Sequence, residues 1–161
     1  SVELYPYKQL IPKGLASVMV AHLSVPSLES RPGFPSSISE GIVTGLLKDK
    51  LQFNGLIFTD ALEMKGVANY ADSGNVDLSA FLAGNDMLLI SADTPEGIKK
   101  LTEAYTNGII TEERLAYSVK KVLKAKYKVG FIGCGLMAMH HASAYYLNPQ
   151  TEIIAASSPT L

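Results

Sequence analysis

The chain has 161 residues, 47% of them hydrophobic, which is enough for one domain of ordinary size with a real hydrophobic core. Fourteen lysines and arginines against fifteen acids leave a net charge of −1, so charge gives no reason to expect binding to nucleic acid or to a membrane surface. A single cysteine excludes an intrachain disulfide, and no apolar run approaches the roughly 20 residues of a spanning helix. We expect a soluble protein whose compartment the sequence leaves open.

Short apolar segments predict three β-strands in the first half of the chain, at residues 16–21 (ASVMVA), 55–59 (GLIFT) and 86–90 (DMLLI). Helical patterns lie between and after them. This alternation is typical of an α/β fold with a parallel sheet.

The helices are predicted from their capping residues. Ser39 is expected to cap the helix EGIVTGLLKDKL at 40–51, which leads into the second strand. Thr94 is expected to open the next helix, which stops near Asn107 and a glycine, and Thr111 to open another with acids in its first turn and lysines toward its end.

The composition changes near the end of the chain. Residues 129–161 carry one charged side chain, Glu152, whereas residues 95–128 carry twelve. We expect this tail to form a strand, a glycine turn, an apolar helix and a second strand, with the strands at 128–132 and 151–156. In one arrangement, all five predicted strands lie side by side in a single open sheet.

Asp60 ends the second apolar strand, and two interpretations of it compete. The carboxyl ends of parallel strands carry the chemistry of α/β proteins, so Asp60 is a candidate catalytic residue. Alternatively, it caps a helix that begins with ALEMKGVAN, and Glu63 completes a capping box. The residues alone favour neither interpretation.

The segment GLIFTDALEMKGVA resembles the nucleophile segment of glycoside hydrolase family 3, and its TDALEM wording is closest to the β-N-acetylhexosaminidase branch. The segments ASVMVAHLSVPSL, AGNDMLLI and TEERLAYSVKKVLKAKYKVG resemble the same family in matching order, over about residues 1–128. The resemblance implies the C-terminal part of a (β/α)8 barrel as a first domain. It also implies retaining hydrolysis of terminal β-N-acetylhexosaminides, with Asp60 as the nucleophile in a covalent intermediate, a carbohydrate substrate and no cofactor.

A retaining glycosidase also needs an acid/base group. In the hexosaminidase branch this is a histidine assisted by an aspartate on an earlier loop, and this chain contains neither motif, so we expect the chain alone to be inactive. His22 follows the first strand at the same sheet end as Asp60. It is a candidate substrate-binding residue, with catalytic substitution and hydrogen-bonded packing as alternatives. Glu63 suits a cap or a surface position, and neither Asp86 nor Asp93 is assigned to chemistry, although Asp93 could cap a helix.

The tail contains Gly133, Gly135 and Ala138 in a GxGxxA pattern between a strand and a helix. Residues 129–161 resemble the first unit of the Gfo/Idh/MocA-type NAD(P)-dependent oxidoreductases, which makes them a second, Rossmann-like segment. The acid that would hold a ribose is replaced by small residues at 156–158, so NAD or NADP binding is only the alternative function.

Three hypotheses follow for the chain: a domain of a glycoside hydrolase, a nucleotide-binding module, and a folded chimera or fragment without activity. No metal site is expected. A partial barrel would leave sheet edges exposed, which predicts self-association.

Overall fold

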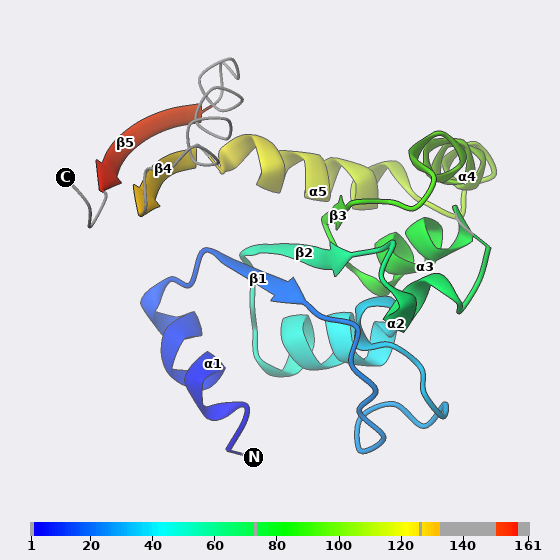
Figure 1. The fold of residues 1–161 in the computed structure, drawn as a ribbon, viewed down its shortest axis with the longest axis horizontal. Coiled ribbons are helices and arrows are strands. Elements are labelled where there is room, and N and C mark those ends of the chain that lie inside the picture. The colour runs from blue at the N-terminus through cyan, green and yellow to red at the C-terminus, as the bar shows by residue number, and fades with distance from the viewer. Residues whose placement is uncertain (1, 73, 126, 133–150, 158–161) are drawn as a thin grey trace. The chain divides into compact units, whose positions relative to one another are not determined.

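The computed structural model describes residues 2–72, 74–125, 127–132 and 151–157, with side chains for the first two ranges (Figure 1). The chain divides into two compact units, Ser1–Val122 and Leu123–Leu161, which we describe separately. The first unit contains a parallel sheet in the order β1-β2-β3, formed by Ser17–Val20, Leu56–Ala61 and Met87–Leu89. The three predicted strands and their parallel α/β arrangement are therefore confirmed.

The described helices precede, separate and follow these strands along the chain. They are α1 (Tyr5–Leu10), the 3-10 helices η1 (Ile11–Lys13) and η2 (Ser36–Ile38), the π-helix η3 (Gly41–Lys50), α2 (Lys65–Ala68), α3 (Asn75–Ala83), α4 (Thr94–Thr106) and α5 (Glu112–Lys124). None of the described helices is long and apolar enough to cross a bilayer.

Of the three expected helix caps, Thr111 is confirmed, whereas Thr94 and Ser39 are wrong, because α4 is capped one residue earlier, by Asp93. Asp93 caps α4 by accepting the Glu96 N–H at 3.1 Å, and Thr111 caps α5 by accepting the Arg114 N–H at 3.2 Å. Ser39 does not cap η3, because its hydroxyl donates to the carboxylate of Glu29 instead.

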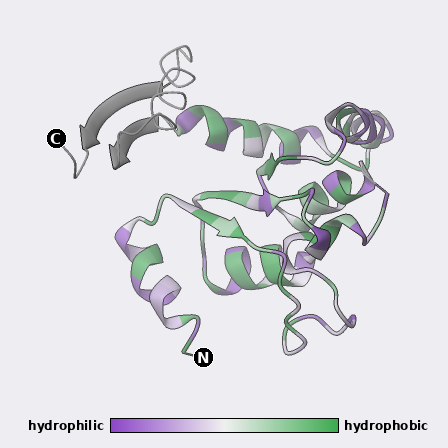
Figure 2. Cartoon of the chain, in the orientation of Figure 1, coloured by the Kyte–Doolittle hydropathy of each residue, from purple (hydrophilic) through white to green (hydrophobic). Residues whose placement is uncertain are grey.

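The two faces of the sheet differ in burial. Val18, Val20 and Ile57 pack with residues of η3 into a buried cluster on the helix side. On the other face, Met19 is 47% exposed and Leu89 is 41% exposed. Figure 2 shows how strongly hydrophobic the strands are compared with α4. The three strands therefore have the sidedness of a barrel wall, with helices covering one face only.

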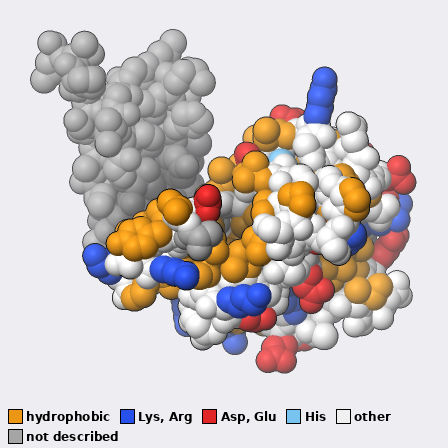
Figure 3. Space-filling model, turned by 90° about the horizontal axis from the view of Figure 1, so that it is seen from below, with side chains coloured by type: hydrophobic (Ala, Val, Ile, Leu, Met, Phe, Trp, Pro, Cys, Tyr) orange, Lys and Arg blue, Asp and Glu red, His pale blue; other side chains and the backbone are white. Residues whose placement is uncertain are grey.

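An apolar groove runs beside β1, the outer strand of this sheet. Its volume is about 800 Å³, and its lining comes mostly from α1, β1, the loop after β1 and η3. Neither His22 nor Asp60 lines it. Figure 3 shows hydrophobic side chains at the surface among charged ones. In the groove lining, Leu23 is 61% exposed and Leu28 is 43% exposed.

The second unit contains β4 (Tyr127–Ile132) and β5 (Thr151–Ser157), which pair in parallel as a strand–helix–strand unit requires. They form a two-stranded sheet of their own. The alternative of one five-stranded sheet is therefore wrong. β3 has only three residues, which leaves few backbone groups with which a further strand could pair.

Candidate active site

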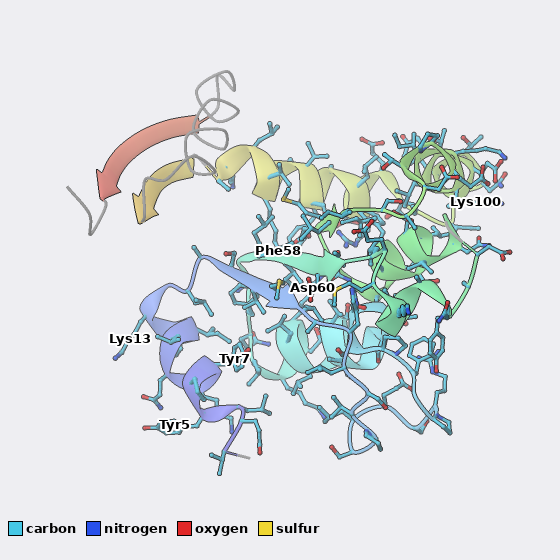
Figure 4. The ribbon with its side chains drawn as sticks, viewed as in Figure 1. Tyr5, Tyr7, Lys13, Phe58, Asp60 and Lys100 are labelled. Atoms are coloured by element: carbon cyan, nitrogen blue, oxygen red, sulfur yellow. The ribbon has the colours of Figure 1, made fainter. Side chains whose placement is uncertain are left out.

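The end of β2 is irregular at the position of Asp60. Phe58 pairs with Met87, and Ala61 pairs with Leu89, so β2 uses one residue more than β3 over this stretch. Such a bulge is common beside active sites, where it redirects a side chain. Figure 4 labels Phe58 and Asp60 on β2.

Side chains and backbone of neighbouring segments secure this bulge. The Thr59 hydroxyl accepts the Leu89 N–H at 2.9 Å, which replaces a ladder hydrogen bond that the bulge removes. Beyond it, Leu62 N–H donates to the Leu89 carbonyl at 2.9 Å, and Glu63 N–H donates to Ile90 at 3.1 Å. Ile90 has φ of 44°, an unfavourable value for a β-branched residue, and such strain often lies at functional sites.

Asp60 is half-buried, and only one of its carboxylate oxygens accepts a hydrogen bond from the described residues. Its Oδ1 accepts the N–H of Ala61 at 2.8 Å, and within the described ranges Oδ2 accepts no hydrogen bond. The competing interpretation, in which Asp60 caps a helix, is wrong. The next helix, α2, begins at Lys65 with Met64 in the cap position, and Glu63 is exposed.

His22 lies at the same end of the sheet as Asp60, as its position after β1 predicts, and contacts the residue that follows Asp60. Its Nε2 lies 2.9 Å from the carbonyl oxygen of Ala61, and its Nδ1 lies 2.6 Å from the hydroxyl of Ser37. Both ring nitrogens therefore have protein partners. Direct binding of substrate by His22 stays a prediction.

The serines at 36–39 hold the loop after β1 in place. The Ser36 hydroxyl donates to the Ala21 carbonyl at 2.5 Å and accepts the Leu23 N–H at 3.1 Å. Ser37 is fully buried, and its carbonyl accepts from the side chain of Asn85 at 2.8 Å. Serine is a residue type that is usually exposed, so the sequence gave no sign that these hydroxyls are buried.

An ion pair between Arg31 and Glu29 also stabilises the loop after β1. Arg31 binds both carboxylate oxygens of Glu29 at 2.8 Å each, and Ser39 donates to one of them at 2.6 Å. The hydrogen bonds from Arg31 and then from Ser39 lower the pKa of Glu29 to about 2. The Arg31 guanidinium also lies 3.4 Å from the centre of the Phe34 ring, which meets Tyr70 edge-on at 5.1 Å.

Asp86 belongs to a different part of the molecule, the N-terminal end of β3. Its side chain is fully buried and accepts hydrogen bonds from the Ile57 N–H, the Ser118 hydroxyl and the Lys121 ammonium, while the Arg114 guanidinium lies 3.6 Å away. Asp86 therefore has a structural role, in agreement with the sequence analysis.

The remaining candidate residues have no described structure. Gly133, Gly135 and Ala138 lie outside the described residues, so NAD or NADP binding stays a prediction. Within the described ranges, no three His, Cys, Asp or Glu side chains are grouped closely enough to hold a metal ion.

Comparison with known proteins gives a consistent result. The Glycosyl hydrolase family 3 N terminal domain matches residues 1–125. A β-hexosaminidase of Actinobacillus pleuropneumoniae serotype 3 is 39% identical over 97 residues, covering 60% of this chain and 27% of the relative. A β-N-acetylglucosaminidase/β-glucosidase of Cellulomonas fimi is 29% identical over 96% of this chain and 30% of its own length.

Solved structures agree with these relatives. A glycoside hydrolase family 3 β-N-acetylglucosaminidase from Paenibacillus sp. str. FPU-7 superposes with a TM-score of 0.72 at 32% identity, over 77% of this chain and 24% of that one. The β-N-acetylglucosaminidase from Thermotoga maritima gives a TM-score of 0.68 at 27% identity, over 76% of this chain and 27% of its own. The chain thus spans about a quarter to a third of the length of these proteins.

Proposed function

The chain belongs to glycoside hydrolase family 3, and we propose that it supplies the nucleophile, Asp60, for retaining hydrolysis of terminal β-N-acetylhexosaminides. The observation that carries this proposal is the state of the Asp60 carboxylate. One oxygen is held by the Ala61 N–H at 2.8 Å, and the other has no hydrogen bond from the described residues. A retaining nucleophile needs this combination of a fixed carboxylate and a free oxygen.

The reaction would proceed in two steps at Asp60. In the first, Oδ2 attacks the anomeric carbon, the bond from that carbon to the leaving oxygen breaks, and the leaving oxygen takes a proton from the acid/base group. In the second, the same group removes a proton from water, which attacks the anomeric carbon and releases the carboxylate. Two inversions give a sugar product with retained configuration.

The acid/base group is proposed to lie outside the described residues. His22 is the imidazole next to Asp60, and both of its nitrogens are bound to protein atoms. Glu63 is exposed, and its N–H is directed to the end of β3. The chain alone is therefore expected to show no turnover.

The substrate class follows from the similar proteins. The names β-hexosaminidase and β-N-acetylglucosaminidase describe those relatives, and the TDALEM segment of this chain agrees with that branch. For this chain we propose a terminal β-linked N-acetylhexosamine, with N-acetylglucosamine as the first sugar to test.

The test is a hybrid enzyme in which residues 1–125 replace the aligned segment of the C. fimi β-N-acetylglucosaminidase/β-glucosidase, which matches 96% of this chain. With 4-nitrophenyl N-acetyl-β-glucosaminide, the hybrid should release nitrophenolate, and Asp60→Asn should lower kcat by about 10³-fold or more. Asp49→Asn, at an exposed acid of η3, is the matched control and should leave kcat unchanged.

A second variant tests the direction of attack. In Asp60→Ala, added azide would occupy the vacated space and attack the anomeric carbon from the side of the missing carboxylate. The expected product is the α-glycosyl azide. Asp60→Asn activity above a tenth of the unmodified hybrid, or a β-azide product, would contradict the assignment.

A further inference from the structure

A continuous row of hydrogen bonds connects the interior of the first unit to Asp60. The Asn85 amide donates to the carbonyl of Ser37 at 2.8 Å, and the Ser37 hydroxyl lies 2.6 Å from Nδ1 of His22. Nε2 of His22 lies 2.9 Å from the Ala61 carbonyl, and the Ala61 N–H donates to Asp60 at 2.8 Å.

The partners determine the tautomer of the imidazole. A backbone carbonyl oxygen can only accept, so Nε2 of His22 carries a proton and donates it to Ala61. In the neutral ring, Nδ1 is then the acceptor, and the hydroxyl of Ser37 is the donor. This direction of donation leaves neither nitrogen available for exchange of protons with a substrate.

Ala61 needs such support because it lies just beyond the regular part of the sheet. The pairing of β1 with β2 ends at Val20 and Thr59, and the bulge interrupts the pairing with β3 before Ala61. His22 stands two residues past Val20 and continues the connection from β1 to β2 through its side chain. Backbone bonds to Leu89 hold the same turn from the β3 side.

The backbone of His22 is held closely as well. A Cβ atom added at Gly66, in α2, would lie 3.2 Å from the Cβ of His22 and 3.5 Å from its carbonyl oxygen. The start of α2 therefore packs directly against this residue. With Ser37 and Ala61 on its ring and Gly66 on its backbone, the imidazole has little freedom to move.

We propose that His22 is a positioning residue for Asp60: as the neutral Nε2–H tautomer, it holds the carbonyl of Ala61 and so restrains the residue whose N–H fixes one oxygen of the carboxylate, which leaves the other oxygen directed toward the anomeric carbon. The inference rests on the proposed role of Asp60. A misplacement of about 1 Å at a reacting atom can cost about 10²-fold in rate, so this restraint has a measurable effect.

The first experiment uses the unmodified 161-residue chain, labelled with ¹⁵N in its histidines. Long-range ¹H–¹⁵N spectra should show the Nε2–H tautomer for His22, identified by the signal that disappears in His22→Gln. The Nδ1–H tautomer would overturn the proposal. This measurement does not require activity.

The second experiment measures hydrogen exchange in the same chain. In His22→Ala, the amide hydrogen of Ala61 should exchange at least about tenfold faster, because Ala61 loses the hydrogen bond that His22 donates to its carbonyl. His22→Gln, whose amide N–H can reach the same carbonyl, should recover much of the protection. The Asp86 amide, bound to the Ile57 carbonyl at the other end of the strands, is the internal control and should not change. Unchanged exchange at Ala61 in folded His22→Ala would overturn the proposal. If that variant does not fold, the same exchange measurement is made in Ser37→Ala, which leaves the imidazole in place. Faster exchange at Ala61 then supports the proposal, and unchanged exchange overturns it.

The third experiment uses the hybrid enzyme to separate positioning from proton transfer. His22→Ala should lower kcat by about 10–100-fold with little change in KM, equally for a nitrophenyl leaving group and for a dinitrophenyl group that needs no protonation. A loss confined to the nitrophenyl substrate would show an acid/base role and overturn the proposal. If Asp60→Asn is inactive and His22→Ala is not impaired, the positioning inference fails alone. If Asp60→Asn stays active, the proposed function fails whatever the spectra show.

Discussion

Asp86→Ala should lower the free energy of unfolding by about 3–5 kcal/mol, which is the usual effect of removing one partner from a buried ion pair. The Asp86 side chain is completely buried, and Lys121 and Arg114 beside it are only 12% and 24% exposed. The substitution leaves these cations without their counter-charge. It also leaves the buried N–H of Ile57 without its acceptor at 3.0 Å, which by itself costs about 1–3 kcal/mol.

The loss is large compared with the whole stability of an ordinary domain, about 5–15 kcal/mol. It can be measured by urea unfolding followed by far-ultraviolet circular dichroism, a suitable signal because the chain contains no tryptophan. Asp49→Ala, at an exposed acid of η3, is the matched control and should change stability by no more than about 0.5 kcal/mol. A loss below about 1 kcal/mol for Asp86→Ala, with an unchanged urea dependence, would refute the reasoning.

Three further predictions concern other residues. Burial lowers the pKa of Lys48 from 10.5 to about 8, so the unfolded state binds more protons between these values and stability should rise with pH across them. Because the ammonium is half-buried, Lys48→Met should remove this rise and stabilise the fold at pH 7 by about 1–2 kcal/mol in urea titrations; an unaltered rise would contradict the cause. Hydrogen bonds from Arg31 and a serine lower the pKa of Glu29 from 4.5 to about 2, so its contribution is complete above pH 4.5 and lost as pH falls through 2. The Tm of Glu29→Gln should therefore fall less between pH 5 and 2 than that of the unmodified chain, and equal falls would disprove this. A Cβ at Gly55 would overlap an aromatic ring and lie 2.5 Å from a backbone carbonyl, so Gly55→Ala should lower the free energy of unfolding in urea by about 2 kcal/mol or more. Gly45→Ala, where no atom crowds the added Cβ, should not destabilise the fold. Equal effects of the two substitutions would contradict the steric reason.

The strands and their parallel arrangement could be predicted because their signal is local. Three consecutive apolar residues, Leu56 to Phe58, indicate a strand, and the ends of this strand and of the one before it placed Asp60 and His22 at one edge of the sheet. The cap Thr111 was predictable for the same reason, since it bonds a backbone N–H three residues on, whereas local sequence did not decide between the neighbouring candidates Asp93 and Thr94.

The turn after Asp60 depends on partners from another strand, which local patterns do not contain. ALEMKGVAN has helical residues, yet the N–H groups of Leu62 and Glu63 are taken by carbonyls at the end of β3. The backbone therefore forms a turn there, closed by the Met64 N–H on the Ala61 carbonyl at 3.1 Å, and the helix begins only at Lys65. Tertiary hydrogen bonds override helix propensity at this point.

The buried hydrogen bonds that support the candidate site could also not be predicted from the sequence. Ser37 and Asn85 are 48 positions apart, and each belongs to a residue type that is usually exposed. Both are fully buried in the structure. Nothing in either local segment indicates that they meet, or that the serine continues to His22.

The contacts of Lys121 limit how far the chain can be shortened. This residue is close to the end of the first unit, and its ammonium bonds both Asp86 and the carbonyl of Gly55, just before β2. A truncated version that stops inside α5 before Lys121 would keep every residue near Asp60. It would lose the hydrogen bonds of Lys121 to Asp86 and Gly55 at the opposite end of the strands. A minimal expressible fragment for crystallography or NMR should therefore extend past residue 121.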